Sequence, residues 1–265
     1  MTATEDSPAT GRALLEAGAV VAGSMSRAAA AVVFPGAGPA PAVRLDDRLA
    51  GCLRTAAEEA TALPLLRERA RAGAVLAFAV EHAASLSRAG RPVRDDDFFT
   101  PRAGRRSAAD EVTEAVVAAA RVSVEERRVR HLGYLLAEVA ASPDLDAALV
   151  DRALRGAAGL SWRQLAVLAG VGRRDRAPLP MTPLPDDPRA WTAWAAREDL
   201  TDLQRAGLLD PPPAQPRPGG AALPRLRPAD LRLTRRGVLV HRLLALGFVR
   251  DDDVAAVLAE LAPPA

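Results

Sequence analysis

The chain has 265 residues, of which 49% are hydrophobic and 26% charged, so it is long enough to bury a core without metals or disulfides. Its 35 basic residues are all arginine and stand against 33 acidic residues, which leaves a net charge of +2. This arginine usage is typical of a GC-rich genome, so it is poor evidence for nucleic-acid binding. The single cysteine excludes an intrachain disulfide and any multi-cysteine zinc site, and it favours a reducing, cytoplasmic location.

The N-terminal region begins with residues 1–11, which we expect to be a disordered tail. Residues 13–34 are rich in alanine and valine, but Glu16 and Arg27 interrupt them. Neither half reaches the roughly 18 to 20 apolar residues that a membrane-spanning helix needs. We therefore expect a packing helix of small residues and no stable membrane span, with an interfacial helix as the open alternative.

The next predicted helix covers about residues 45–63, where Leu45, Leu49 and Leu53 form one apolar stripe. Cys52 lies beside that stripe and is not accompanied by a histidine motif. The favoured interpretation is a small buried residue, and a catalytic thiol is the poor one.

Further helices are expected up to about residue 159, each with its own start signal. Their starts are Pro64, the capping boxes Ser107 with Asp110 and Ser123 with Glu126, and Ser142 with Pro143. The fold class predicted from these elements is all-α, with a helical bundle over residues 12–159.

Two runs of three carboxylates, at residues 95–97 and 251–253, could suggest divalent-metal ligands. Consecutive side chains diverge, however, and both runs precede helices, whose N-termini favour negative charge. We expect helix capping and no metal.

The last third of the chain differs in its sequence pattern, with shorter predicted helices and a loop rich in proline and glycine. A short helix opens with Ser161 and Gln164 in a capping-box arrangement, and a second runs to Gly207. A loop rich in proline and glycine follows, then an alternating segment, and Thr234 can cap another helix.

The order LSWRQLAVL, DLQRAGLLD, variable loop and LRLTRRGVLVHRLL resembles the winged helix of multiple-antibiotic-resistance regulators. The resemblance covers roughly residues 160–246. It implies a winged-helix-like domain over residues 160–265 with at most a small β-hairpin, whose strands are the GLL segment and the segment before LT-x-x-G. The recognition helix would fall near residues 190–205.

The charges of this region divide between the expected recognition helix and the expected wing. The helix carries Glu198, Asp199 and Asp202, which would oppose binding to phosphates. The candidate nucleic-acid-binding residues are instead Arg217, Arg225, Arg227, Arg232, Arg235 and Arg236. A solvated arginine-rich loop is the alternative interpretation.

A second resemblance rests on RPVRDDDFF, RSAADEVTEAVVAAA, EERRVRHLGYLLAEVA and LSWRQL. These segments look similar to a set of uncharacterised bacterial helical proteins. The resemblance implies no activity, and a defence or mobile-element context is a hypothesis that goes with it.

The histidines offer no catalytic pattern, since His82, His131 and His241 are more than forty residues apart and none has a partner four residues on. The nearest candidate is His131 with Arg130 and Tyr134, within one turn of a helix, and a polar contact between helices explains it equally well. P-loop and nucleophile-elbow motifs are absent. We expect no enzyme and no cofactor.

The aromatic residues have two possible uses. Trp191, Trp194, Phe98 and Phe99 are candidate interface residues, but filling the core is the favoured interpretation for both pairs. The sequence thus predicts a non-enzymatic interaction or regulatory protein that acts through protein contacts or self-association. The alternative is a DNA-binding transcriptional regulator that uses the basic wing.

Overall fold

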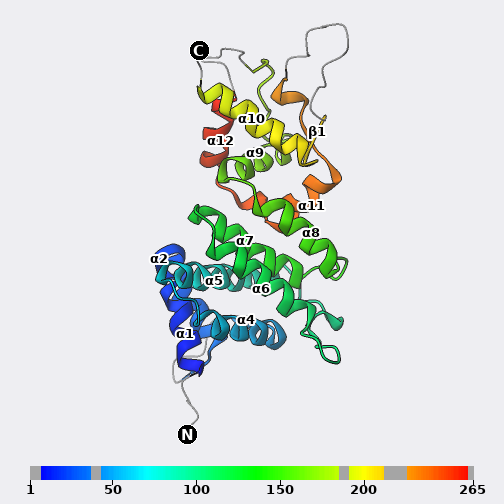
Figure 1. Cartoon of the computed structure of the whole chain (residues 1–265). Coiled ribbons are helices and arrows are strands. Elements are labelled where there is room, and N and C mark those ends of the chain that lie inside the picture. The colour runs from blue at the N-terminus through cyan, green and yellow to red at the C-terminus, as the bar shows by residue number, and fades with distance from the viewer. Residues whose placement is uncertain (1–6, 37–42, 185–190, 212–225, 262–265) are drawn as a thin grey trace. The chain divides into compact units, whose positions relative to one another are not determined.

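The computed structural model describes residues 7–36, 43–184, 191–211 and 226–261, and these are mainly helical, as the sequence predicts (Figure 1). The chain forms two compact units, Met1–Arg155 and Gly156–Ala265, which are described separately below. The boundary lies inside one helix, four residues before the boundary predicted from the sequence. Arg217 and Arg225 lie outside the described residues.

Unit 1 consists of helices in the described ranges. They are α1 (Ser7–Ala17), α2 (Ala19–Ala22), α3 (Met25–Val33), α4 (Asp47–Ala60), α5 (Leu66–Arg88), the 3-10 helix η1 (Asp97–Phe99), α6 (Ala108–Arg121) and α7 (Glu126–Ala140). The helix that contains the unit boundary is α8 (Ala147–Ala158).

The predicted tail over residues 1–11 is wrong from Ser7 onward, because α1 begins there. Leu14 and Leu15 of α1 are buried in the core, and Gly11 lies against the ring of Phe34. These contacts order a segment whose composition alone favours disorder.

The apolar N-terminal segment packs inside unit 1, which confirms the packing interpretation. Ala29, Ala30 and Val33 of α3 are buried together with the leucines of α1. The segment is three short helices rather than one, and Gly23 between α2 and α3 has a positive φ of 65°. None of the helices in the described ranges is long and apolar enough to span a bilayer.

Helix α5 is the centre of unit 1, since every residue from Ala70 to Val80 is buried. Helices α1, α3, α6 and α7 all pack against it. Three of these contacts bring backbones together at glycine. A Cβ atom on Gly73 would lie 2.1 Å from the carbonyl oxygen of Leu14, one on Gly18 would lie 2.4 Å from the nitrogen of Ala74, and one on Gly133 would lie 2.5 Å from the carbonyl oxygen of Val75.

Unit 2 has short helices and one small sheet in its described part. Its elements are α9 (Trp162–Gly172), α10 (Trp191–Arg205), β1 (Leu209–Asp210), η2 (Pro228–Asp230), β2 (Arg232–Leu233), α11 (Arg235–Leu243), η3 (Leu246–Phe248) and α12 (Asp251–Glu260). The strands pair antiparallel, with Leu209 opposite Leu233 and Asp210 opposite Arg232. Helix α9 contacts α10, α11, α12 and β2, so it lies at the centre of this core.

Two of the three predicted capping boxes are present, at Ser107 with Asp110 and at Ser161 with Gln164. The third is wrong. The hydroxyl of Ser123 donates instead to the carbonyl oxygen of Glu125, 3.1 Å away, and Glu125 is the N-cap of α7. The hydroxyl oxygen of Thr234 caps α11 as predicted, accepting from the amide of Gly237 at 2.9 Å.

The backbone contacts of α5 predict opposite effects for the same substitution at different glycines. Gly51 in α4 has open space where a Cβ would lie. Gly51→Ala should therefore stabilise the protein by about 0.5 to 1 kcal/mol through helix propensity. Gly73→Ala and Gly133→Ala should destabilise it by about 1 to 3 kcal/mol through overpacking. Urea unfolding measures all three, and a stabilising Gly73→Ala would contradict the observed packing.

Candidate functional site

The carboxylate runs at residues 95–97 and 251–253 contain side chains that bind other groups of the chain. Asp96 caps η1 by accepting from the amide of Phe98 at 3.3 Å, and it also pairs with Arg94. Asp251 pairs with Arg173 at 2.7 Å. Over the described ranges, no group of histidine, cysteine and carboxylate side chains is arranged to hold a metal ion.

A buried polar cluster joins α5 and α7 in unit 1. Nε2 of His82 lies 2.8 Å from Oε1 of Glu138, and both side chains are almost fully buried. The guanidinium of Arg91 donates to both carboxylate oxygens, at 3.3 and 2.9 Å. Glu138 is thus held from two sides, which satisfies a charge that would otherwise be costly to bury.

Aromatic rings pack around this cluster. Tyr134 stacks on His82 with ring centroids 4.5 Å apart, and His131 meets the edge of Tyr134 at 5.6 Å. Arg130 instead lies over the ring of Phe78. Arg130 and Tyr134 of the predicted grouping therefore make contacts between helices, from α7 to Phe78 and His82 of α5.

The pKa of the Glu138 carboxyl reflects its two partners. Burial raises this pKa, but hydrogen bonds from His82 and Arg91 lower it more, so it lies below the ordinary value. The neighbouring cleft of about 190 Å³ is lined by Arg91, by the polar residues Arg44, Asp46 and Ser87 and by apolar residues, and neither His82 nor Glu138 lines it. A buried, charged carboxylate held by two hydrogen-bonding partners stabilises the packing of α5 against α7.

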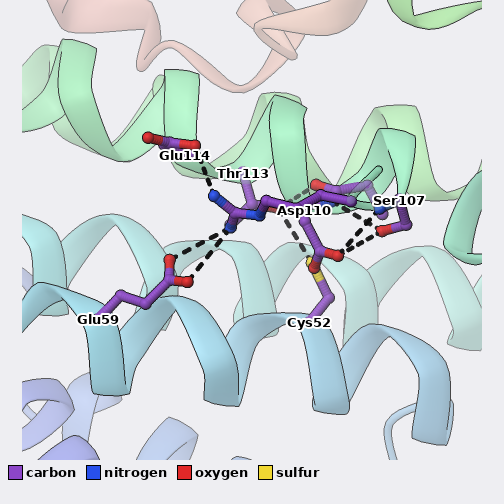
Figure 2. Close-up of polar contacts among 8 residues, drawn as sticks. Cys52, Glu59, Ser107, Asp110, Thr113 and Glu114 are labelled. Atoms are coloured by element: carbon purple, nitrogen blue, oxygen red, sulfur yellow. Dashed lines mark hydrogen bonds and ion pairs between the residues drawn. The ribbon is translucent and has the colours of Figure 1, made fainter. Parts of the chain in front are cut away.

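Cys52 is buried against α6, which confirms the sequence interpretation. Figure 2 shows its Sγ beside Thr113, where the sulfur lies 3.2 Å from Oγ1. Burial raises the pKa of the thiol to about 12. The thiolate required of a nucleophile is therefore disfavoured at neutral pH.

Trp191 and Trp194 lie on the surface of α10, with 74% and 50% of their surface exposed. The core interpretation of these two residues is therefore wrong. Their rings pack edge to face with centroids 5.9 Å apart. The buried face of α10 consists of two alanines with Leu200, Leu203 and Gln204, which leaves the tryptophans outside.

The phenylalanines differ from the tryptophans. Phe98 is buried, with Arg94 over its ring at 4.4 Å, so the core interpretation holds for it. Phe99 is half-buried, meets the edge of Phe98 at 5.2 Å and has Arg48 near its ring. This pair belongs to the seam between α4, η1 and α6.

The described candidate arginines lie near the small sheet and are all exposed. Arg227 pairs with Asp230 at 2.7 Å, Arg232 donates to the carbonyl oxygens of Ala229 and Leu231, and Arg236 donates to that of Ala206. Three of these four guanidinium groups therefore bind groups of the chain close to the small sheet. Arg235 is exposed at the first turn of α11.

The exposed face of α10 was the feature hardest to foresee from sequence, and the His82, Glu138 and Arg91 cluster was missed entirely. The only sequence signal for the cluster was Glu138 itself, an acid among the apolar residues near the end of α7. Its partners lie 56 and 47 residues away.

No protein-family model matches the chain, and no curated protein or solved structure is significantly similar to it.

The polar cluster predicts a pH dependence. Because the pKa of Glu138 is lowered in the folded state, its contribution is complete above the unfolded value of about 4.3 and is lost as the pH falls through the folded value. Glu138→Gln should cost about 2 to 3 kcal/mol at neutral pH and flatten the acid limb of stability. The matched control is Glu114→Gln, which removes one of the two exposed carboxylate partners of Arg106 and should cost less than about 1 kcal/mol. An unchanged acid limb in Glu138→Gln, measured by urea unfolding across pH, would contradict this account.

Proposed function

We propose that the protein is a non-enzymatic regulatory protein that acts through protein contacts, and that the exposed face of α10 is where a second copy of the chain binds. The observation that carries the proposal is the exposed pair Trp191 and Trp194. Tryptophan is concentrated at the centres of protein interfaces, where it contributes much of the binding energy.

The charge of α10 indicates what its partner presents. Residues 191, 194, 198 and 202 share one helical face, so Glu198 and Asp202 extend the tryptophan surface. Asp199 lies off this face and pairs with Arg163 at 2.9 Å, whereas Asp202 pairs with Arg205 of the same helix at 3.4 Å. A partner surface of arginine and aliphatic side chains complements such a face, through ion pairs and through cations over the indole rings.

This chain carries that partner surface on α11. Arg235 and Val238 are exposed and lie three residues apart, on one face of the helix. Because α10 and α11 belong to the same unit, a two-fold axis would form the α10 to α11 contact twice. This symmetry favours a second copy over an unrelated partner.

The winged-helix interpretation of unit 2 is part of the proposal. The order α9, α10, β1, β2 and α11 supports it, as do the strand positions at Leu209 and Leu233, which match the segments that the resemblance assigns to the wing. Under this interpretation α10 takes the place of the recognition helix. Its surface is aromatic and acidic, which suits protein better than DNA.

The second candidate function is a DNA-binding regulator that uses the arginines around the small sheet. The observation in its favour is the exposure of Arg227, Arg232, Arg235 and Arg236. The ion pair of Arg227 and the carbonyl contacts of Arg232 and Arg236 make these three less available to phosphates, so the protein-contact proposal is preferred.

Self-association is tested with the full chain by light scattering or sedimentation over a wide range of concentration. We expect a dimer whose dissociation constant rises at least about 30-fold in the Trp191→Ser, Trp194→Ser variant, since even one interface tryptophan at the centre of a contact contributes about 2 kcal/mol or more. Phe248→Ser is the matched control, because it removes another exposed aromatic residue of unit 2. A wild-type chain that stays monomeric, or a double variant that dimerises as the wild type does, would overturn the proposal.

The DNA alternative makes a separate prediction about salt. A wing that neutralises phosphates binds DNA with an affinity that falls steeply with salt, with a slope of about −0.9 for each phosphate contacted. We expect only weak DNA binding at physiological salt, unchanged by Arg227→Gln with Arg235→Gln. Tight, salt-sensitive binding that this pair of substitutions weakens would establish the DNA function in place of the proposed one. Fluorescence anisotropy with duplex DNA measures it.

A further inference from the structure

One end of unit 1 exposes four aliphatic side chains. Leu65 and Leu66, at the start of α5, are 60% and 69% exposed, and Val122 and Val124, between α6 and α7, are 65% and 80% exposed. None of the four contributes to the core. Such a set of exposed aliphatic residues marks a binding surface when its members lie together.

Two contacts place these residues at the same end. Arg67 of α5 reaches Glu126, the first residue of α7, at 3.7 Å. Arg71 of α5 donates to the carbonyl oxygen of Arg121, the last residue of α6, at 3.2 Å. The start of α5, the end of α6 and the start of α7 are therefore neighbours. Leu65 and Leu66 lie at the start of α5, and Val122 and Val124 lie in the turn between α6 and α7.

The same end is strongly basic. Residues 65–71 and 121–130 contain seven arginines against three glutamates, a net charge of +4, whereas the whole chain has a net charge of +2. Arg67, Arg121, Arg127 and Arg130 are exposed there. The N-termini of α5 and α7 and the C-terminus of α6 lie at this end, so the two positive dipole ends outnumber the negative one.

We propose that this end of unit 1, which we call the aliphatic tip, docks on the surface of an anionic lipid bilayer. Leu65, Leu66, Val122 and Val124 insert at the boundary between headgroups and acyl chains, and the surrounding arginines bind lipid phosphates. Aliphatic residues ringed by arginine are the composition of interfacial membrane anchors. The insertion is shallow and agrees with the finding that the described helices are not built to cross a membrane.

A bilayer fits the aliphatic tip better than a protein partner does. The four side chains come from the start of α5 and from the turn between α6 and α7 rather than from a groove or a continuous helix face, so they can enter a lipid surface without rearrangement. The tip has none of the aromatic side chains that dominate protein interfaces and that α10 displays. Since α10 belongs to unit 2, membrane binding by the tip and self-association through α10 can be tested independently of each other.

The test is cosedimentation of the full chain with vesicles of phosphatidylcholine alone and of phosphatidylcholine with phosphatidylserine. We expect binding to the vesicles that contain phosphatidylserine and little binding to the neutral ones. Leu66→Glu with Val124→Glu should abolish binding while circular dichroism shows an unchanged thermal transition. Met181→Glu, which places the same charge at an exposed residue of unit 2, is the matched control and should bind as the wild type does.

A charge variant separates insertion from simple attraction. Arg121→Gln with Arg127→Gln should weaken binding about 25-fold, since each arginine near an anionic surface contributes about a fivefold factor. Absence of binding to anionic vesicles overturns the proposal. So does binding that the arginine variant weakens and the leucine and valine variant leaves unchanged, because the aliphatic side chains would then not insert.

Discussion

Unit 1 depends on the approach of three helix backbones with no side chain between them. At Gly18, Gly73 and Gly133 the backbones of α1, α5 and α7 come so close that a single methyl group would collide with a carbonyl oxygen or an amide nitrogen. Close approach of this kind gains dispersion energy from the backbone itself. It also explains how a chain with only 3% aromatic residues forms a dense core, since alanine and glycine suffice where helices nearly touch.

The close packing of unit 1 also encloses its buried ionisable groups. The buried ionisable groups between α5 and α7 are held in a closed set of hydrogen bonds, with His82 and Arg91 both on Glu138. The buried thiol of Cys52 is similarly enclosed, with Thr113 beside it. These interior groups bind one another and stabilise the fold.

Two surfaces differ in chemistry and belong to different units. The face of α10 combines indole rings with carboxylates, a composition suited to specific contact with an arginine-bearing protein surface. The aliphatic tip combines leucine and valine with arginine and suits a fluid, anionic partner. A protein with both surfaces could associate with itself and with a membrane through separate parts of the chain.

The sequence predicted those features that depend on neighbouring residues. Helical periodicity located the described helices from α4 onward, and the capping boxes at Ser107 and Ser161 are present, whereas the same spacing at Ser123 forms no box. Local sequence patterns did not predict the contacts between segments that are distant in the sequence. Periodicity places Trp191 and Trp194 on one face of a helix, but whether that face is covered depends on tertiary packing. In the same way, ordering from Ser7 onward depends on partners that α1 finds only in the folded unit.

The most direct test of this account is native-state hydrogen exchange, because it reports the free energy with which each amide opens. If the backbone contacts of α5 hold unit 1 together, the amides from Ala70 to Val80 exchange only through global unfolding, with the free energy that urea unfolding gives. Exchange of these amides through local openings, at rates like those of exposed helix ends, would contradict the central place given to α5.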